Sequence, residues 1–309
     1  MSKHITTLSA LFLLQLIIAG LLFSTNSGMQ SNINPQSLVH MDKNELNQIQ
    51  IIAKDTELIL TKHEGDWRLK EYPELPLLAS KITSLTSELT DTQVTWPVTR
   101  TASSHERFKV AEDNFEKRIV FTDKNNNKHE LLLGESPSYK QLYVRDADGD
   151  EVFSIEYSAY QLSTKASDWL DKSLLSINGI SKVSHSSVNL EKHDNEWQLT
   201  SPTKLNDQQS LNTESITDLV NQLTSLTVSG IAEETYEATN KLIIHDDKNT
   251  EYIYSFAANN DNYFVKRNDI NQWFTIPKLK FETLANVSVD KFISETSEQE
   301  EDEANNISE

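Results

Sequence analysis

A chain of 309 residues with 37% hydrophobic and 8% aromatic side chains is long enough for two or three domains with apolar cores. Its formal charge of −19, from 28 basic and 47 acidic side chains, repels nucleic-acid phosphates and argues against a general nucleic-acid binder. The absence of cysteine excludes disulfides, a thiolate metal site, a cysteine nucleophile and a lipid anchor attached to cysteine.

The first predicted element is a membrane-spanning helix at Ile5 to Phe23, a run without any charge. At ~1.5 Å per residue this run spans ~28 Å, close to the ~30 Å hydrocarbon core of a bilayer. Lys3 precedes the run, so the positive-inside rule places the short N-terminus in the cytoplasm and the rest of the chain outside. The alternative is a cleaved signal peptide, for which Leu22-Phe23-Ser24 does not supply a clean small-x-small cleavage site.

The chain after this anchor divides into four predicted parts. Residues 24–44 are rich in Ser, Asn and Gln and predict a polar tether. Residues 45–175 and 176–293 predict two related folded repeats, and residues 294–309 predict an acidic, disordered tail.

The evidence for a duplication is a stretch that occurs twice. Leu58 to Leu69 reads LILTKHEGDWRL, and 130 positions later Val188 to Leu199 reads VNLEKHDNEWQL. Both copies alternate apolar and polar residues, break at a turn-forming pair (Glu64-Gly65 or Asp194-Asn195) and resume with a tryptophan. This pattern predicts a β-hairpin with one buried face.

An amphipathic helix and a run of strands are predicted after each hairpin. Leu78, Ile82, Leu85 and Leu89 recur at helical spacing, and Ile82, Leu85, Leu89 and Val94 return 134 positions later as Ile216, Leu219, Leu223 and Val228. The strands that follow are predicted at residues 118–122, 129–133, 141–145 and 151–155, and again at 241–245, 252–256, 263–267 and 273–276. The predicted fold class is therefore α+β: an N-terminal transmembrane helix, then two tandem repeats of an antiparallel-sheet-plus-helix unit.

With these elements in place, the chain resembles the bacterial family catalogued as domain of unknown function 4340, over about Leu46 to Ile293. The resemblance rests on a set of short motifs in a fixed order: Trp67-Arg-Leu69, Leu133-Gly134-Glu-Ser-Pro137, Tyr143-Val-Arg145, Val152-Phe-Ser-Ile155, Trp169-Leu-Asp-Lys172-Ser-Leu-Leu175 and Trp197-Gln-Leu199. Phe108-Lys-Val110 departs from the family, which usually has an aromatic-Gly-Leu and a proline there. The resemblance implies a single-pass protein of the bacterial inner membrane, with its bulk in the periplasm and ABC transporter subunits of the gliding-motility type as partners.

The histidines and tryptophans of the two hairpins are the first candidate site residues. Lys62-His63 recurs as Lys192-His193 and could supply ligands or bases, although polar residues beside a turn are ordinarily exposed bystanders. Trp67 and Trp197 could stack on sugars, but tryptophan at a fixed position of an alternating strand is more often part of a core.

Two acidic segments are the next candidates. Asp146-Ala-Asp148-Gly149-Asp150-Glu151 is similar to a calcium loop, but its glycine is fourth rather than sixth, so a hairpin turn is the better interpretation. His245-Asp246-Asp247 lacks further histidines at metal-ligand spacing. The sequence predicts no catalytic residue, no cofactor-binding residue, no metal site and no cofactor.

The favoured function is a non-enzymatic, membrane-anchored accessory protein that contacts a membrane partner. This hypothesis requires an exposed apolar patch or an open sheet edge on a folded unit. The alternative is a binding module for an envelope polymer or lipid, in a cleft between the repeats lined by aromatics such as Tyr139, Tyr143 or Trp273. An enzyme would require titratable groups that converge in a pocket, which the sequence does not show.

Overall fold

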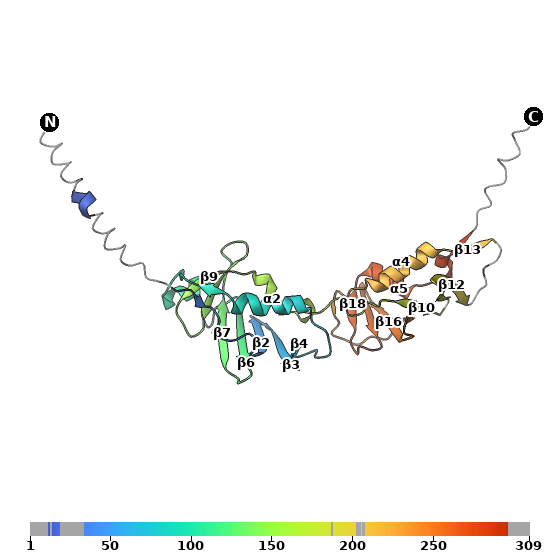
Figure 1. Ribbon diagram of the computed structural model, residues 1–309, viewed down its shortest axis with the longest axis horizontal. Coiled ribbons are helices and arrows are strands. Elements are labelled where there is room, and N and C mark those ends of the chain that lie inside the picture. The colour runs from blue at the N-terminus through green and yellow to red at the C-terminus, as the bar shows by residue number, and fades with distance from the viewer. Residues whose placement is uncertain are drawn as a thin grey trace, which may run out of the picture. The chain divides into compact units, whose positions relative to one another are not determined.

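The computed structural model describes residues 12, 14–18, 34–186, 188–201, 205 and 208–295 (Figure 1). Among these residues no helix is long and apolar enough to cross a bilayer. Of the predicted anchor, only Phe12 and residues 14–18 are described, as helix. The rest of the anchor lies outside the described residues, as do residues 24–33 of the predicted tether and all but the first two residues of the predicted tail.

The expected α+β fold class is wrong. The described residues form a fold made mostly of β-sheet, with 40% of them in strands and 21% in helices. The physical reason for the error is size. Each predicted repeat contains one long amphipathic helix of 12 residues beside a sheet of seven or eight strands, so the sheets dominate both the backbone hydrogen bonding and the core.

The first large sheet has the strand order β4-β3-β2-β6-β7-β8-β9. Its strands are β2 Leu46–Ala53, β3 Thr56–His63, β4 Asp66–Leu69, β6 Lys117–Asp123, β7 Lys128–Leu133, β8 Gln141–Asp146 and β9 Val152–Glu156. The remaining elements of this part are β1 Gln36–Ser37, α2 Ala79–Thr90, β5 Gln93–Val94, η1 Ala102–Ser104, α3 His105–Phe108, η2 Ala159–Gln161 and η3 Ala166–Asp168. β4 and β9 are therefore the two edges of the sheet.

The second large sheet has the order β12-β11-β10-β15-β16-β17-β18-β14. Its strands are β10 Ile180–His185, β11 Val188–His193, β12 Glu196–Ser201, β14 Gly230–Ile231, β15 Asn240–Asp246, β16 Glu251–Asn259, β17 Asn262–Arg267 and β18 Phe274–Ile276. The other elements are β13 Gln209–Leu211, α4 Thr213–Thr224, α5 Lys278–Ala285, η4 Val289–Phe292 and β19 Ile293–Glu295. Element for element, this order repeats that of the first sheet, with β14 added beyond β18.

The chain divides into two compact units by the contacts among its residues. One unit comprises residues 1–56 and 84–162, and the other comprises residues 57–83 and 163–309. The division falls at the start of β3, within the first sheet. Strand β9 lies within the first of these units, and strands β14 and β18 lie within the second.

The duplicated hairpins form where the sequence predicts them. In the first, Leu60 pairs with Leu69, and the turn residues Glu64 and Gly65 have φ of 52° and 98°. In the second, His193 pairs with Glu196 around Asp194 and Asn195, whose φ values are 49° and 70°. Positive φ at both central residues gives the turn the twist that matches paired strands, which is why Gly, Asn and Asp serve there.

The amphipathic helices also lie where the spacing predicts them. Ile82, Leu85 and Leu89 of α2 are buried, as are the corresponding Ile216, Leu219 and Leu223 of α4. Asn212 caps α4 by accepting a hydrogen bond from the Ser215 amide at 3.0 Å.

Candidate functional site

The repeated histidines do not form a site. His63 and His193 are exposed at the ends of their hairpins, and the nearest carboxylate oxygen to His193 Nε2 is that of Glu191 at 3.9 Å. Trp67 and Trp197 are half-buried rather than either fully buried or fully exposed. Lys62 pairs with Trp67 across the hairpin and places its ammonium 5.9 Å from the ring centroid, so it covers part of the tryptophan.

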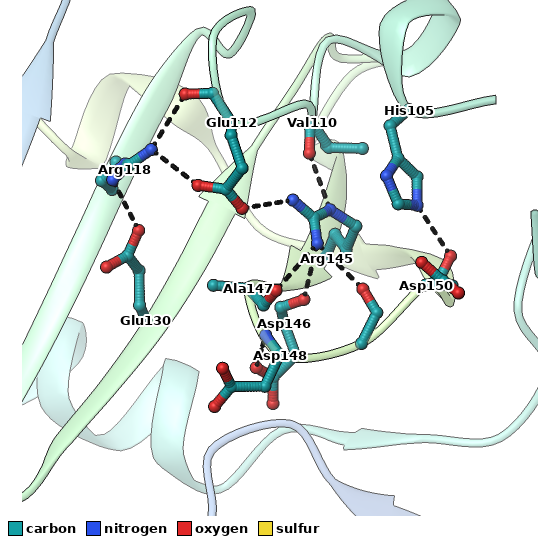
Figure 2. A network of polar contacts seen from close by, with 11 residues as sticks. His105, Val110, Glu112, Arg118, Glu130, Arg145, Asp146, Ala147, Asp148 and Asp150 are labelled. Carbon is teal, nitrogen blue, oxygen red and sulfur yellow. Dashed lines mark hydrogen bonds and ion pairs between the residues drawn. The ribbon is translucent and has the colours of Figure 1, made fainter. Parts of the chain in front are cut away.

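The loop that is similar to a calcium site is filled by an arginine. Arg145 is 4% exposed, and its Nη1 donates to the carbonyl oxygens of Asp146, Ala147 and Gly149 at 3.2, 3.0 and 2.9 Å. Figure 2 shows the guanidinium beside the turn, with dashed lines that join it to Asp146 and Ala147. The guanidinium thus supplies the positive charge and the donors at this turn, so the turn serves the fold of the β8–β9 hairpin.

Glu112 extends this network to a second arginine. Arg145 Nε donates to the Val110 carbonyl at 2.8 Å and Nη2 to Glu112 at 2.7 Å, while Arg118 contacts both Glu112 at 3.0 Å and Glu130 at 2.8 Å (Figure 2). Charge-assisted hydrogen bonds of this kind fix the 110–118 loop to the sheet. The family motif residue Arg145 is therefore structural.

The remaining predicted residues also take structural positions. His245 Nε2 lies 3.6 Å from Glu251, and Asp246 accepts the Lys248 and Thr250 amides within its hairpin turn, which holds the pKa of its carboxyl below the usual value. No group of three or more histidine, aspartate and glutamate side chains that could hold a metal occurs among the described residues.

Of the three aromatics considered for ligand binding, only one is exposed. Trp273 is 5% exposed and packs with Tyr236 and Phe264 in a core cluster. Tyr143 packs edge-on against Phe108 with ring centroids 4.7 Å apart. Tyr139 is 87% exposed.

An open sheet edge, not a catalytic cluster, is the distinctive feature of the first unit. The segment after α2 approaches β9 and pairs with it at one point: the Val98 amide donates to the Val152 carbonyl at 2.7 Å, and the Val152 amide donates to the Thr99 carbonyl at 3.0 Å. Beyond this point the segment leaves β9, and among the described residues no backbone hydrogen bond joins Trp96 or Pro97 to Ser154.

The alternation of an antiparallel strand shows which backbone groups are left open. Val152 turns its N–H and C=O away from β8, so Ser154 and Glu156 do the same. Within the described part of the chain, neither of these two residues has a backbone hydrogen bond on that side. A slot of about 290 Å³ runs beside them. Its walls are Thr92, Gln93, Val94, Thr95 and Trp96 on one side and Phe153, Ser154, Ile155 and Glu156 on the other.

The second sheet provides an internal comparison, because the corresponding edge is closed there. The 134-residue offset matches Val98 with Ala232, and the Ala232 amide donates to the Trp273 carbonyl at 2.9 Å as Val98 does to Val152. Here, however, the pairing continues: β14 pairs with β18, and the Ser229 amide donates to the Thr275 carbonyl at 2.7 Å. Thr275 corresponds to Ser154, whose carbonyl is open.

Two substitutions between the repeats accompany the difference. Pro97 stands where the second repeat has Ile231, and Trp96 stands where it has Gly230. A Cβ on Gly230 would lie 3.1 Å from Thr275 Oγ1, a tight contact that glycine avoids. Trp96, in the corresponding position of the first repeat, is 69% exposed beside the slot. Sequence reasoning missed this site, although comparing Thr95-Trp-Pro97 with Ser229-Gly-Ile231 at the 134-residue offset would have indicated that the repeats differ here.

Comparison with known proteins places the chain in a family but gives no activity. No curated protein and no solved structure matches it. The sequence pattern of one family, described as "Domain of unknown function (DUF4340)", matches residues 67–243, which is more than half of the chain. The chain therefore belongs to the DUF4340 family.

Proposed function

We propose that this protein is a non-enzymatic interaction protein that binds an extended segment of a partner along β9. The single observation that supports the proposal most strongly is the open edge at Ser154 and Glu156, which corresponds to a closed edge in the second repeat. Adding a strand to an exposed sheet edge is a common mode of peptide recognition. Unpaired strand edges are otherwise a liability that proteins cover or blunt.

The exposed side chains around the slot suit a protein partner. Trp96, which lines the slot, is 69% exposed, and Val98, two residues further along, is 47% exposed. Tryptophan is enriched among the residues that contribute most to binding at protein interfaces. The partner that we propose, following the family resemblance, is a subunit of an ABC-type transport system in the bacterial envelope.

The strength of the contact is limited by the length of the edge. Ser154 and Glu156 offer four backbone groups, and a protein hydrogen bond contributes a net ~0.5–1.5 kcal/mol. Such a contact supports regulated or reversible docking of a flexible segment. It also predicts that the partner gains further affinity from contacts outside the slot.

Cross-linking from the slot tests this function. Because the chain has no cysteine, an introduced cysteine is the only thiol of the protein that the reagent can label. A Ser154→Cys variant, labelled with a short photoactivatable reagent and activated in native membranes, should cross-link to a transporter subunit. Ser103→Cys, exposed in the same unit, is the matched control and should give little of the same product. Equal cross-linking from both positions, or none from Ser154→Cys, would contradict the proposal.

A further inference from the structure

Resting on this proposed function, we propose that the segment bound along β9 is basic, with a lysine or arginine side chain at the Glu156 end of the slot. The occupant is thus an extended cationic segment of a protein partner.

The slot itself carries one charge. Among its lining residues only Glu156 is ionisable, and within the described residues no cation forms an ion pair with it. Its side chain is exposed, so Glu156 remains available to a ligand. A strand that pairs with the open edge passes directly beside this carboxylate.

A second carboxylate lies near the same end. Thr92, which lines the slot, donates its hydroxyl to the carbonyl of Glu88 one turn earlier in α2. The Glu88 carboxylate is close enough to Tyr157, the residue after Glu156, to contribute to its raised pKa, of which burial is the larger cause. Glu88 is exposed and has no ion-pair partner among the described residues.

Two cations beside the slot are already paired with other carboxylates. Lys43 Nζ lies 2.9 Å from Asp91, and Arg100 Nε lies 3.1 Å from Glu151, which precedes β9 at the closed end of the slot. The residues that line the slot carry one negative charge and no positive charge, in a chain whose formal charge is −19. Complementary charge of this kind favours cationic partners and speeds their association.

Three capped hexapeptides test the inference on the full-length protein. They share a Thr-Val-Thr-Val centre and carry lysine, glutamine or glutamate at both ends, and binding is followed by the anisotropy of a fluorophore on the peptide. The lysine peptide should bind about 5- to 10-fold more tightly than the glutamine peptide, and the glutamate peptide should bind most weakly. This preference should shrink as salt is raised from 50 to 500 mM, because exposed charges are screened.

Two variants separate this inference from the proposed function. In the Glu88→Gln/Glu156→Gln variant, the affinity of the lysine peptide should fall close to that of the glutamine peptide. An unchanged ratio of the two affinities would overturn the inference that the bound segment is basic. In Trp96→Gly/Pro97→Ile, which imports the residues of the second repeat, all three peptides should lose binding. If all three peptides bind the wild-type protein equally and lose binding in that variant, binding along β9 is supported and the preference for a basic segment is rejected. If no peptide binds the wild-type protein, or if Trp96→Gly/Pro97→Ile does not change binding, both the proposed function and the preference for a basic segment are rejected.

Discussion

Arg145 shows that the turn from Asp146 to Glu151 has a structural role. The carboxylates of this turn are similar to those of a cation-binding loop, but Arg145 donates three hydrogen bonds to its backbone carbonyls. The alternation of β8 predicts only that Arg145 lies in a strand. Its burial inside the turn depends on the 110–118 loop, whose course the sequence does not indicate.

The role of Arg145 predicts a large loss of stability on a conservative substitution. Arg145→Lys keeps the charge but cannot reach Val110, Glu112 and the three turn carbonyls together, so buried acceptors lose their partner. We expect the free energy of unfolding, measured by urea denaturation, to fall by about 3 kcal/mol. Arg100→Lys, at an exposed ion pair, is the control and should cost less than about 1 kcal/mol. Equal losses in the two variants would argue against a structural role for the network.

Local sequence patterns predict the hairpins and helices of this fold, but not the order of its strands. The alternation and the turn pairs predict both hairpins, and helical spacing predicts α2 and α4, because these signals are local. The order of strands in each sheet and the edge that each leaves open depend on pairings across many residues. The position of Val152 in the folded chain, rather than any local pattern, shows which backbone groups of β9 are left unpaired.

The hairpin turns that follow β6 and β15 predict an acid-sensitive contribution to stability. Asp123 accepts hydrogen bonds from the side chain of Asn127 and from the amides of Asn127 and Asn125, each at 2.8 Å, and these lower its pKa. A lowered pKa in the folded state means that the stabilisation is complete above the ordinary pKa of aspartate, ~3.9, and is lost as pH falls below it.

Asp123→Asn isolates this contribution. The difference in urea midpoint between the wild-type protein and Asp123→Asn should be largest near pH 6 and should narrow between pH 4 and pH 2.5, because protonation removes the charge that the turn stabilises. Asp218→Asn, at an exposed position of α4, serves as the control and should show a smaller change with pH. A difference for Asp123→Asn that stays constant down to pH 2.5 would show that its charge does not stabilise the turn.

The whole molecule reads as a duplication in which the two copies have diverged at one edge. The sequence predicts the repetition itself, since motifs recur at offsets of 130 and 134 residues, and it overestimates helix because it weighs one clear amphipathic pattern against many short strands. The functional hypothesis required an exposed patch or open edge, and β9 supplies one. The two copies thus differ at this edge: β14 pairs with β18 in the second sheet, whereas Ser154 and Glu156 of β9 keep unpaired backbone groups in the first.

Closing the edge should remove binding without unfolding the protein. Trp96→Gly/Pro97→Ile gives the first repeat the residues with which the second repeat pairs β14 to β18, so Ser154 should gain a backbone partner. We expect the urea midpoint to stay within the range of surface variants or to rise, because exposed tryptophan is removed and hydrogen bonds are added. Tyr160→Ala, at a residue 93% exposed outside the slot, is the control and should retain binding.

Amide hydrogen exchange at Ser154 and Glu156 tests most simply whether β9 is an open edge that receives a partner strand. It is measured in the presence and absence of the partner that cross-links from Ser154→Cys. We expect both amides to exchange quickly in the free protein and to become protected when the partner binds, while the Ala232 amide in the closed edge is protected throughout. Protection of Ser154 and Glu156 in the free protein, or no change on binding, would contradict the claim that β9 is an open edge that receives a partner strand.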